Sequence, residues 1–259
     1  MPKIAFIGAG STVFAKNVLG DCLLTDVLRD ARISLIDVDP VRLRDSEAMV
    51  RALNRTLGAS AVVEAFPAAE AERALAGADY VVNAIQVGGY EPCTVADFEI
   101  PKKYGLRQTI GDTLGIGGIF RALRTIPVLL DYCRILERVA PGALLLNYTN
   151  PMAILTGAML RLSNVKTVGL CHSVQICADH LLKGLGMPYD ETVQWKIAGI
   201  NHQAWLLEIT RDGADLYPEI KRRALERTEK HNDMVRYELM RRFGYYVTES
   251  SEHNAEYTP

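Results

Sequence analysis

The segment that decides the fold is KIAFIGAGST, residues 3–12. An apolar run of strand length leads directly into the glycine pair Gly8 and Gly10, and a helical pattern begins at Thr12. A Rossmann fold starts in this way. The first glycine permits a tight turn, the second lets a pyrophosphate approach the backbone, and the helix N-terminus offers N–H groups to it. We therefore predict that Gly8, Gly10, Ser11 and Thr12 bind a dinucleotide.

The acidic residue expected after the second strand is also present. Asp37 ends the next apolar run, and a carboxylate there suits the adenine-ribose hydroxyls and disfavours a 2′-phosphate, which indicates NAD. Arg42 and Arg44 nearby weigh toward NADP, and Val13 replaces the third glycine of the fingerprint. The alternative is a glycine turn in an α/β fold without a nucleotide. Asn83 ends a later strand, where it would contact the nicotinamide ribose or cap the next loop.

Short apolar runs alternate with amphipathic stretches along most of the chain. Near-continuous apolar strands are typical of parallel sheets covered on both faces, so we predict a doubly wound α/β fold and an NAD-binding domain over residues 1–192. The expected strands are 3–7, 33–36, 61–64, 80–84, 143–147 and 166–170. The expected helices are 12–24, 41–57, 68–75, 116–139, 152–162 and 174–185.

The pattern changes in the last part of the chain. Two strands, 194–200 and 204–210, are followed by a turn at Asp212-Gly213 and by one long charged helix, 216–243. We interpret residues 193–259 as the beginning of a second, α+β domain that is incomplete.

Composition excludes several classes of protein. The 259 residues are 49% hydrophobic and 23% charged with a net charge of −2, which indicates a soluble globular protein without the basic surface that nucleic acid requires. No apolar run approaches the roughly 20 residues of a membrane span. The first strand leaves no room for a signal peptide, so we expect a cytoplasmic protein. Five cysteines without CxxC spacing suit free thiols in a reducing compartment.

Three polar motifs lie where strands end or loops begin: NYTNP at 147–151, CHSVQ at 171–175 and GINH at 199–202. In the predicted topology they would meet at the carboxyl edge of the sheet. Cys171 and His202 are competent metal ligands, and ligand softness alone favours zinc. The alternative is a buried cysteine and a hydrogen-bonded histidine.

A glycine-rich stretch, residues 111–118, leads into a helix. Its backbone N–H groups could bind a phosphate or another polar ligand at the helix N-terminus. It could equally be a tight turn that lets the following helix pack closely on the sheet. Its position in the fold does not separate these two interpretations.

Taken together, the motifs resemble a known family. GAGS at 8–11, NYTNP, CHSVQ, GINH and SEHNAEY at 251–257 are similar to the NAD- and manganese-dependent family-4 glycoside hydrolases. CHSV resembles the α-galactosidase (melibiase) branch. The resemblance covers essentially the whole chain, and because family members are much longer, the chain resembles the front part of one.

The resemblance implies roles for particular residues. Cys171 and His202 would bind Mn²⁺ instead of zinc, and Asn150 and Asn201 would contact the sugar. The implied reaction is hydrolysis of melibiose-type α-galactosides by NAD-dependent oxidation at C3, elimination, water addition and re-reduction. The full-length protein is expected to be a homo-oligomer, a dimer or a tetramer.

The family's acid and base also fall on positions of this chain. The residue after the metal-binding cysteine acts as the general acid in some branches, and His172 occupies that position. A tyrosine in the second part is the usual base, and Tyr257 is the candidate.

Three alternatives stay open. The first is a sister specificity, an α-glucosidase or an α-uronidase. The second is an NAD-dependent hydroxy-acid dehydrogenase, which shares the fold but uses a His/Asp pair and an arginine without a metal; the Cys171 and His202 pair disfavours it. The third is a truncated chain that binds NAD but does not turn over sugar, which the end at Pro259 favours.

Overall fold

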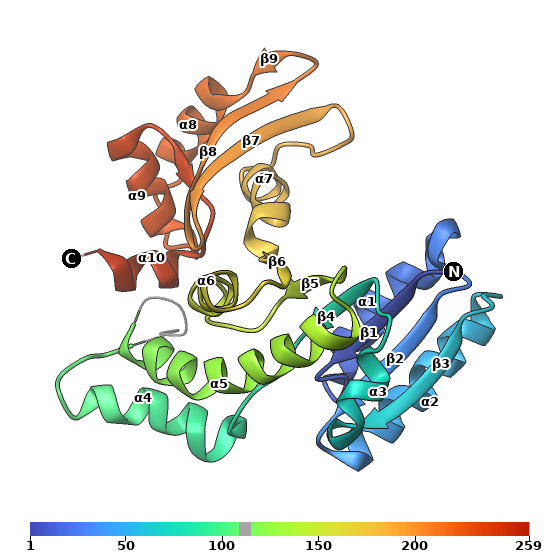
Figure 1. Cartoon of the computed structure of the whole chain (residues 1–259). Helices are drawn as coiled ribbons and strands as arrows, with labels where there is room; N and C mark the ends of the chain where they lie inside the picture. Colours follow the sequence, from blue (N-terminus) through green and yellow to red (C-terminus); the bar gives the residue numbers. More distant parts are fainter. Residues whose placement is uncertain (109–114, 259) are drawn as a thin grey trace. The chain divides into compact units, whose positions relative to one another are not determined.

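The computed structural model describes residues 1–108 and 115–258. The chain forms two compact units (Figure 1). Unit 1 comprises Met1–Glu99 and Ile116–Leu170, and unit 2 comprises Ile100–Gly115 and Cys171–Pro259. The predicted domain boundary after residue 192 stays a prediction about the whole protein. Of the glycine-rich stretch, residues 111–114 lie outside the described residues, so both interpretations of it stay untested.

Unit 1 is built on a six-stranded parallel sheet with the order β3-β2-β1-β4-β5-β6. This is the strand order of the Rossmann fold, and it confirms the predicted doubly wound α/β class. The strands are β1 Lys3–Ile7, β2 Arg32–Asp37, β3 Val62–Pro67, β4 Tyr80–Asn83, β5 Leu144–Asn147 and β6 Lys166–Gly169.

The two faces of this sheet pack against different helices. Side chains alternate along a strand, so Ile4 and Phe6 of β1 enter one hydrophobic cluster while Ala5 and Ile7 enter the other. The first cluster contains α1 (Thr12–Leu24) and α2 (Pro40–Thr56); the second contains α3 (Ala71–Leu75), α5 (Ile116–Val139) and α6 (Met152–Leu162). An additional helix, α4 (Val95–Lys102), was not predicted.

Unit 2 combines helices with a small antiparallel sheet. Helix α7 (His172–Gly184) precedes a hairpin of β7 (Val193–Ile200) and β8 (Gln203–Arg211), and β10 (Tyr246–Val247) and β9 (Ala214–Asp215) also pair with β8. Apolar residues of α7, β8 and the later helices form one core, which includes Leu181, Leu206, Ile220 and Tyr246.

The prediction of one long helix over 216–243 is wrong. The segment forms two helices, α8 (Tyr217–Glu226) and α9 (Met234–Phe243). The chain leaves helical geometry at Arg227, where ψ is 86°. A continuous helix of this length would extend roughly 40 Å, so its two apolar faces could not both reach one small core. The break allows Ile220 and Met240 to pack in the same cluster.

The end of the described chain is also helical. Residues after Glu249, which the sequence shows only as a polar and aromatic cluster, form α10 (Ser251–Tyr257). The Ser250 side chain accepts a hydrogen bond from the His253 backbone N–H and so caps the helix.

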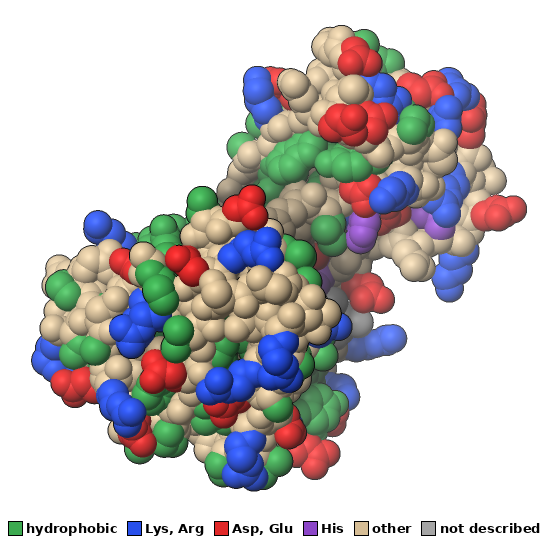
Figure 2. All heavy atoms as spheres, turned by 90° about the vertical axis from the view of Figure 1, so that its right-hand side faces the viewer, with side chains coloured by type: hydrophobic (Ala, Val, Ile, Leu, Met, Phe, Trp, Pro, Cys, Tyr) green, Lys and Arg blue, Asp and Glu red, His purple; other side chains and the backbone are tan. Residues whose placement is uncertain are grey.

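The surface carries both charges. On the face seen in Figure 2, acidic and basic side chains are intermixed. Across the described ranges, no helix combines the length and apolar character that a membrane crossing requires.

Candidate functional site

The glycine turn after β1 leaves no room for side chains. Gly8 has a φ of 85°, and a Cβ there would lie 2.7 Å from the Ala84 carbonyl carbon. A Cβ on Gly10 would lie 2.7 Å from Asp37 Oδ2. Glycine is therefore required at both positions by contacts within the protein, and the turn brings the backbone close to the end of β2.

Asp37 lies directly against this turn. Its Oδ2 accepts a hydrogen bond from the Gly10 N–H at 2.6 Å, and its Oδ1 accepts one from the Asp39 N–H at 2.9 Å. Ser11 provides no side-chain cap to α1, and Val13 in the first turn is 74% exposed. The carboxylate and the uncapped end of α1 are thus adjacent, in the arrangement that the Rossmann fold uses for a ribose and a pyrophosphate.

Asn83 is placed differently from the other predicted dinucleotide residues. Its side chain is fully buried at the end of β4, and its Nδ2 donates to Asn147 Oδ1 at 2.8 Å and to Thr149 Oγ1 at 3.1 Å. Its Oδ1 is buried and has no hydrogen-bond partner within the described part of the chain. The amide nitrogen of Asn83 therefore forms hydrogen bonds inside unit 1. The predicted contact with the nicotinamide ribose would have to use the carbonyl oxygen, and it stays a prediction.

Three side chains of unit 2 form a candidate metal centre. Cys171 precedes α7, His202 lies in the turn between β7 and β8, and Glu249 follows β10. One ligand atom of each lies within 4.8 Å of the others. His202 and Glu249 are buried, and Cys171 is half-buried. The structure brings together the two ligands predicted from sequence and adds a carboxylate that the sequence analysis missed.

A chain of hydrogen bonds connects these groups. The Cys171 thiol donates to Ser173 Oγ at 3.5 Å, and the Ser173 hydroxyl donates to Glu249 Oε2 at 2.5 Å. Glu249 Oε2 is also 3.2 Å from His202 Nε2. Burial raises the pKa of Cys171, but hydrogen bonds with His202 and Ser173 outweigh burial and lower the pKa of this thiol below its ordinary value. A thiol with a lowered pKa forms the thiolate, the form that binds metals, more readily.

The turn that carries His202 is held in an unusual conformation. His202 has a φ of 61°, which non-glycine residues seldom adopt, and its ring makes an edge contact with His253 at 4.9 Å between centroids. Among the residues that the structure describes, none forms a hydrogen bond with the buried Oδ1 of the neighbouring Asn201. An orphaned buried oxygen beside a candidate ligand suits the predicted contact of Asn201 with a polar ligand.

The remaining predicted residues lie at element ends. His172 is the first residue of α7 and is exposed. Tyr257 is the last residue of α10, and its ring is 6.4 Å from the ring of His253. Asn150 follows β5 in unit 1 and is half-buried. The roles predicted for these residues stay predictions.

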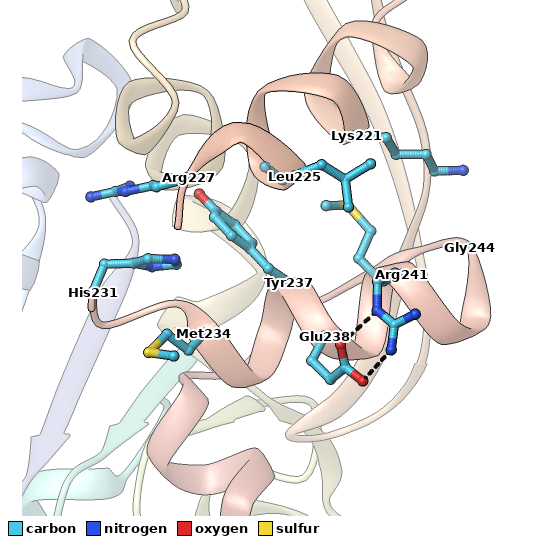
Figure 3. A pocket seen from close by; sticks show the side chains of 11 residues that line it. Lys221, Leu225, Arg227, His231, Met234, Tyr237, Glu238, Arg241 and Gly244 are labelled. Atoms are coloured by element: carbon cyan, nitrogen blue, oxygen red, sulfur yellow. Dashed lines mark hydrogen bonds and ion pairs between the residues drawn. The ribbon is translucent and has the colours of Figure 1, made fainter. Parts of the chain in front are cut away.

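A separate cavity of unit 2 shares no residue with the metal centre (Figure 3). It has a volume of about 540 Å³ and lies between α8 and α9, with apolar walls from Leu225, Met234 and Met240. An ion pair between Glu238 and Arg241 at 2.7 Å lies on its wall. None of its described lining residues belongs to the sequence motifs that predict dinucleotide, metal or sugar binding.

Unit 1 has the strand order of dinucleotide-binding Rossmann folds, and unit 2 carries a candidate metal centre of thiol, imidazole and carboxylate. Residues 3–187 match the family described as family 4 glycosyl hydrolase, and residues 197–259 match the family 4 glycosyl hydrolase C-terminal domain. The chain therefore belongs to the family 4 glycosyl hydrolases.

Two relatives are α-galactosidases. The chain is 63% identical over 260 residues to an α-galactosidase of Bacillus subtilis (strain 168), covering 100% of this chain and 60% of the relative. It is 38% identical over 262 residues to an α-galactosidase of Rhizobium meliloti (strain 1021), covering 99% of this chain and 52% of the relative. The chain thus spans little more than half the length of these relatives.

Solved structures agree with this fold. A provisionally named glucosidase from Bacillus subtilis superposes with a TM-score of 0.85 at 26% identity, covering 100% of this chain and 63% of that one. A 6-phospho-α-glucosidase from gut microorganisms, solved in complex with NAD and Mn²⁺, superposes with a TM-score of 0.82 at 19% identity, covering 99% of this chain and 60% of that one.

Proposed function

We propose that the whole protein to which this chain belongs is an NAD- and Mn²⁺-dependent α-galactosidase acting on melibiose-type substrates. The observation that carries this proposal is the 63% identity to an α-galactosidase across the full chain. A second α-galactosidase at 38% identity supports the same glycone.

The residues of unit 1 fit NAD. Gly8 and Gly10 open the turn, the end of α1 lacks a side-chain cap, and Asp37 presents a carboxylate at the same place. A carboxylate there hydrogen-bonds ribose hydroxyls and repels a 2′-phosphate, which favours NAD over NADP. A family structure with NAD bound supports the choice.

The cluster of unit 2 fits a divalent cation. Thiol, imidazole and carboxylate ligand atoms converge within 4.8 Å in a largely buried place. Softness of the thiol alone favours zinc, but the carboxylate makes the donor set harder, and a family structure with Mn²⁺ bound supports manganese. When bound, NAD⁺ supplies hydride acceptance and return, and Mn²⁺ supplies Lewis-acid polarisation of the oxidised sugar.

The protein's own side chains would then move protons and hold the substrate. In this proposal Tyr257 removes the proton from C2 of the sugar, and His172 protonates the oxygen of the leaving group. Asn150 and Asn201 hydrogen-bond sugar hydroxyls. The buried, unpartnered Oδ1 of Asn201 supports its part of this assignment, because a substrate hydroxyl would satisfy it.

We also infer that the protein works in a reducing compartment, as expected for the cytoplasm. All five cysteines are free, and Cys171 needs a reduced thiol to bind metal. A homo-oligomeric state of the full-length protein stays a prediction.

The test is an assay of the whole protein under reducing conditions with aryl α-galactoside, NAD⁺ and Mn²⁺, each cofactor omitted in turn. Aryl α-glucoside, aryl α-galacturonide and 2-hydroxy acids serve as competing substrates. We expect α-galactoside hydrolysis that requires both cofactors and leaves no net NADH. Hydrolysis without NAD⁺ would overturn the mechanism. Preference for another glycone would favour a sister specificity, and NADH accumulation with hydroxy acids would favour a dehydrogenase.

A further inference from the structure

Glu249 is a buried carboxylate with an unusual set of neighbours. Its side chain is about 10% exposed, and Oε2 contacts the Ser173 hydroxyl at 2.5 Å and His202 Nε2 at 3.2 Å. Oε1 accepts the Ser250 N–H at 3.0 Å and lies 3.6 Å from His253 Nδ1. Within residues 1–108 and 115–258, no lysine or arginine forms an ion pair with it.

Such a carboxylate lacks a permanent positive partner. Burying a charge is costly unless a counter-charge or several hydrogen bonds compensate for it. The two imidazoles beside Glu249 carry charge only when they are protonated. A divalent cation held jointly with Cys171 and His202 would supply the missing positive charge.

We propose that Glu249 is the third protein ligand of the Mn²⁺ site, an inference that rests on the proposed function. The separation of 3.2 Å between His202 Nε2 and Glu249 Oε2 suits this role. Two ligand atoms that are each about 2.1 Å from one ion, at a right angle, lie about 3.0 Å apart. Without the ion, the same separation is that of an ordinary hydrogen bond. The two side chains can therefore adopt this arrangement before a metal ion binds.

The carboxylate is held in place by its surroundings. The Ser173 hydroxyl and the Ser250 N–H each donate to it, and Ser250 is also the N-cap of α10. Groups that orient ligands in this way commonly change metal affinity when they are removed. The start of α10 therefore fixes the direction of Glu249.

As a ligand, Glu249 would also influence whether the site prefers Mn²⁺ or Zn²⁺. A site with only thiolate and imidazole favours zinc, whereas carboxylate oxygen suits manganese. Removing the carboxylate should therefore weaken Mn²⁺ binding more than Zn²⁺ binding. A residue that merely supports the fold would weaken both alike.

The experiment uses the whole protein, reduced and metal-free. Mn²⁺ binding is followed by loss of the electron paramagnetic resonance signal of the free ion, and Zn²⁺ binding by calorimetry. The variants are Glu249→Gln, Cys171→Ser and the control Glu252→Gln, which removes an exposed carboxylate from α10. We expect Glu249→Gln to raise the Kd for Mn²⁺ about 100-fold, with a smaller change for Zn²⁺, and Glu252→Gln to stay within about twofold of the wild type.

Co²⁺ spectra separate direct ligation from support of the fold. In Glu249→Gln the thiolate-to-Co²⁺ absorption should persist, because Cys171 still binds, while the d–d bands should change with the ligand set. If Glu249→Gln does not fold, Glu249→Asp, which keeps a carboxylate, should bind Mn²⁺ more weakly than the wild type but still give Cys171-dependent Co²⁺ absorption.

The outcomes distinguish the two proposals. Wild-type Mn²⁺ affinity and an unchanged Co²⁺ spectrum in Glu249→Gln would overturn the role of Glu249 and leave the metal site intact. Equal losses of Mn²⁺ and Zn²⁺ binding with unchanged d–d bands would also overturn it. If Cys171→Ser binds Mn²⁺ like the wild type, or if the wild type binds none, the metal site itself is wrong, and the role of Glu249 fails with it.

Discussion

At the scale of single residues, one carboxylate holds the glycine turn of unit 1. Asp37 accepts hydrogen bonds from the Gly10 and Asp39 backbone N–H groups. The position of Asp37 at the end of β2 can be predicted from the sequence. Its contact with Gly10 cannot, because the two residues are 27 positions apart. The same carboxylate therefore shapes the turn and, in the proposed function, also binds the ribose.

Replacing Asp37 by alanine should weaken NAD⁺ binding. A hydrogen bond that involves a charged group contributes about 1–3 kcal/mol, so calorimetry should show a Kd raised by roughly 5- to 150-fold. Asp26→Ala, which changes an exposed carboxylate of the same unit, should leave the affinity unchanged. An unaltered Kd in Asp37→Ala would remove Asp37 from the dinucleotide site.

Replacing His172 by alanine tests the acid role. If His172 protonates the leaving group, the whole enzyme should lose more kcat/KM with melibiose, which has a poor leaving group, than with p-nitrophenyl α-galactoside. His180→Ala changes another exposed histidine of α7 and should affect both substrates little. Equal losses on the two substrates in His172→Ala would argue against an acid.

At the scale of elements, the sequence predicts unit 1 better than unit 2. Most of the parallel strands, such as β1 and β5, are nearly continuous apolar runs, and α1, α5 and α6 have the predicted bounds. In unit 2 the helices are short, and a charged stretch conceals the break between α8 and α9. Cys171 and His202 could be predicted from their motifs. Glu249 could not, because its partner Ser173 is 76 positions away and only the fold brings them together.

The break between α8 and α9 should matter for the stability of unit 2. Ile220 of α8 is fully buried in the core, so Ile220→Ala should lower the free energy of unfolding by about 2–5 kcal/mol. Leu225 of the same helix is 66% exposed, and Leu225→Ala should cost less than about 0.5 kcal/mol. Urea unfolding measures both. Equal costs would contradict the burial of Ile220 in the core of unit 2.

At the scale of the whole molecule, the two predicted cofactors belong to different compact units. The predicted dinucleotide residues Gly8, Gly10 and Asp37 lie in unit 1, and the candidate metal centre lies in unit 2. Each unit has a hydrophobic core of its own. Because a ligand stabilises the structure that binds it, each cofactor should stabilise its own unit most.

Hydrogen exchange followed by mass spectrometry checks this separation. NAD⁺ should slow exchange most over β1, α1 and the end of β2, and Mn²⁺ should slow it most over the β7–β8 turn and the start of α10. A Cys171→Ser variant should lose the Mn²⁺ effect and keep the NAD⁺ effect. Protection by Mn²⁺ confined to unit 1 would contradict the assignment of the metal centre.

The proposed reaction oxidises the galactoside at C3 and removes the proton from C2, so the origin of the C2 hydrogen in the product tests this mechanism. The protein is allowed to hydrolyse melibiose in D₂O with NAD⁺ and Mn²⁺, and the released galactose is analysed by NMR. Because Tyr257 would exchange its proton with solvent before C2 is reprotonated, we expect deuterium at C2 of the product. Complete hydrolysis that yields galactose without deuterium at C2 would contradict it.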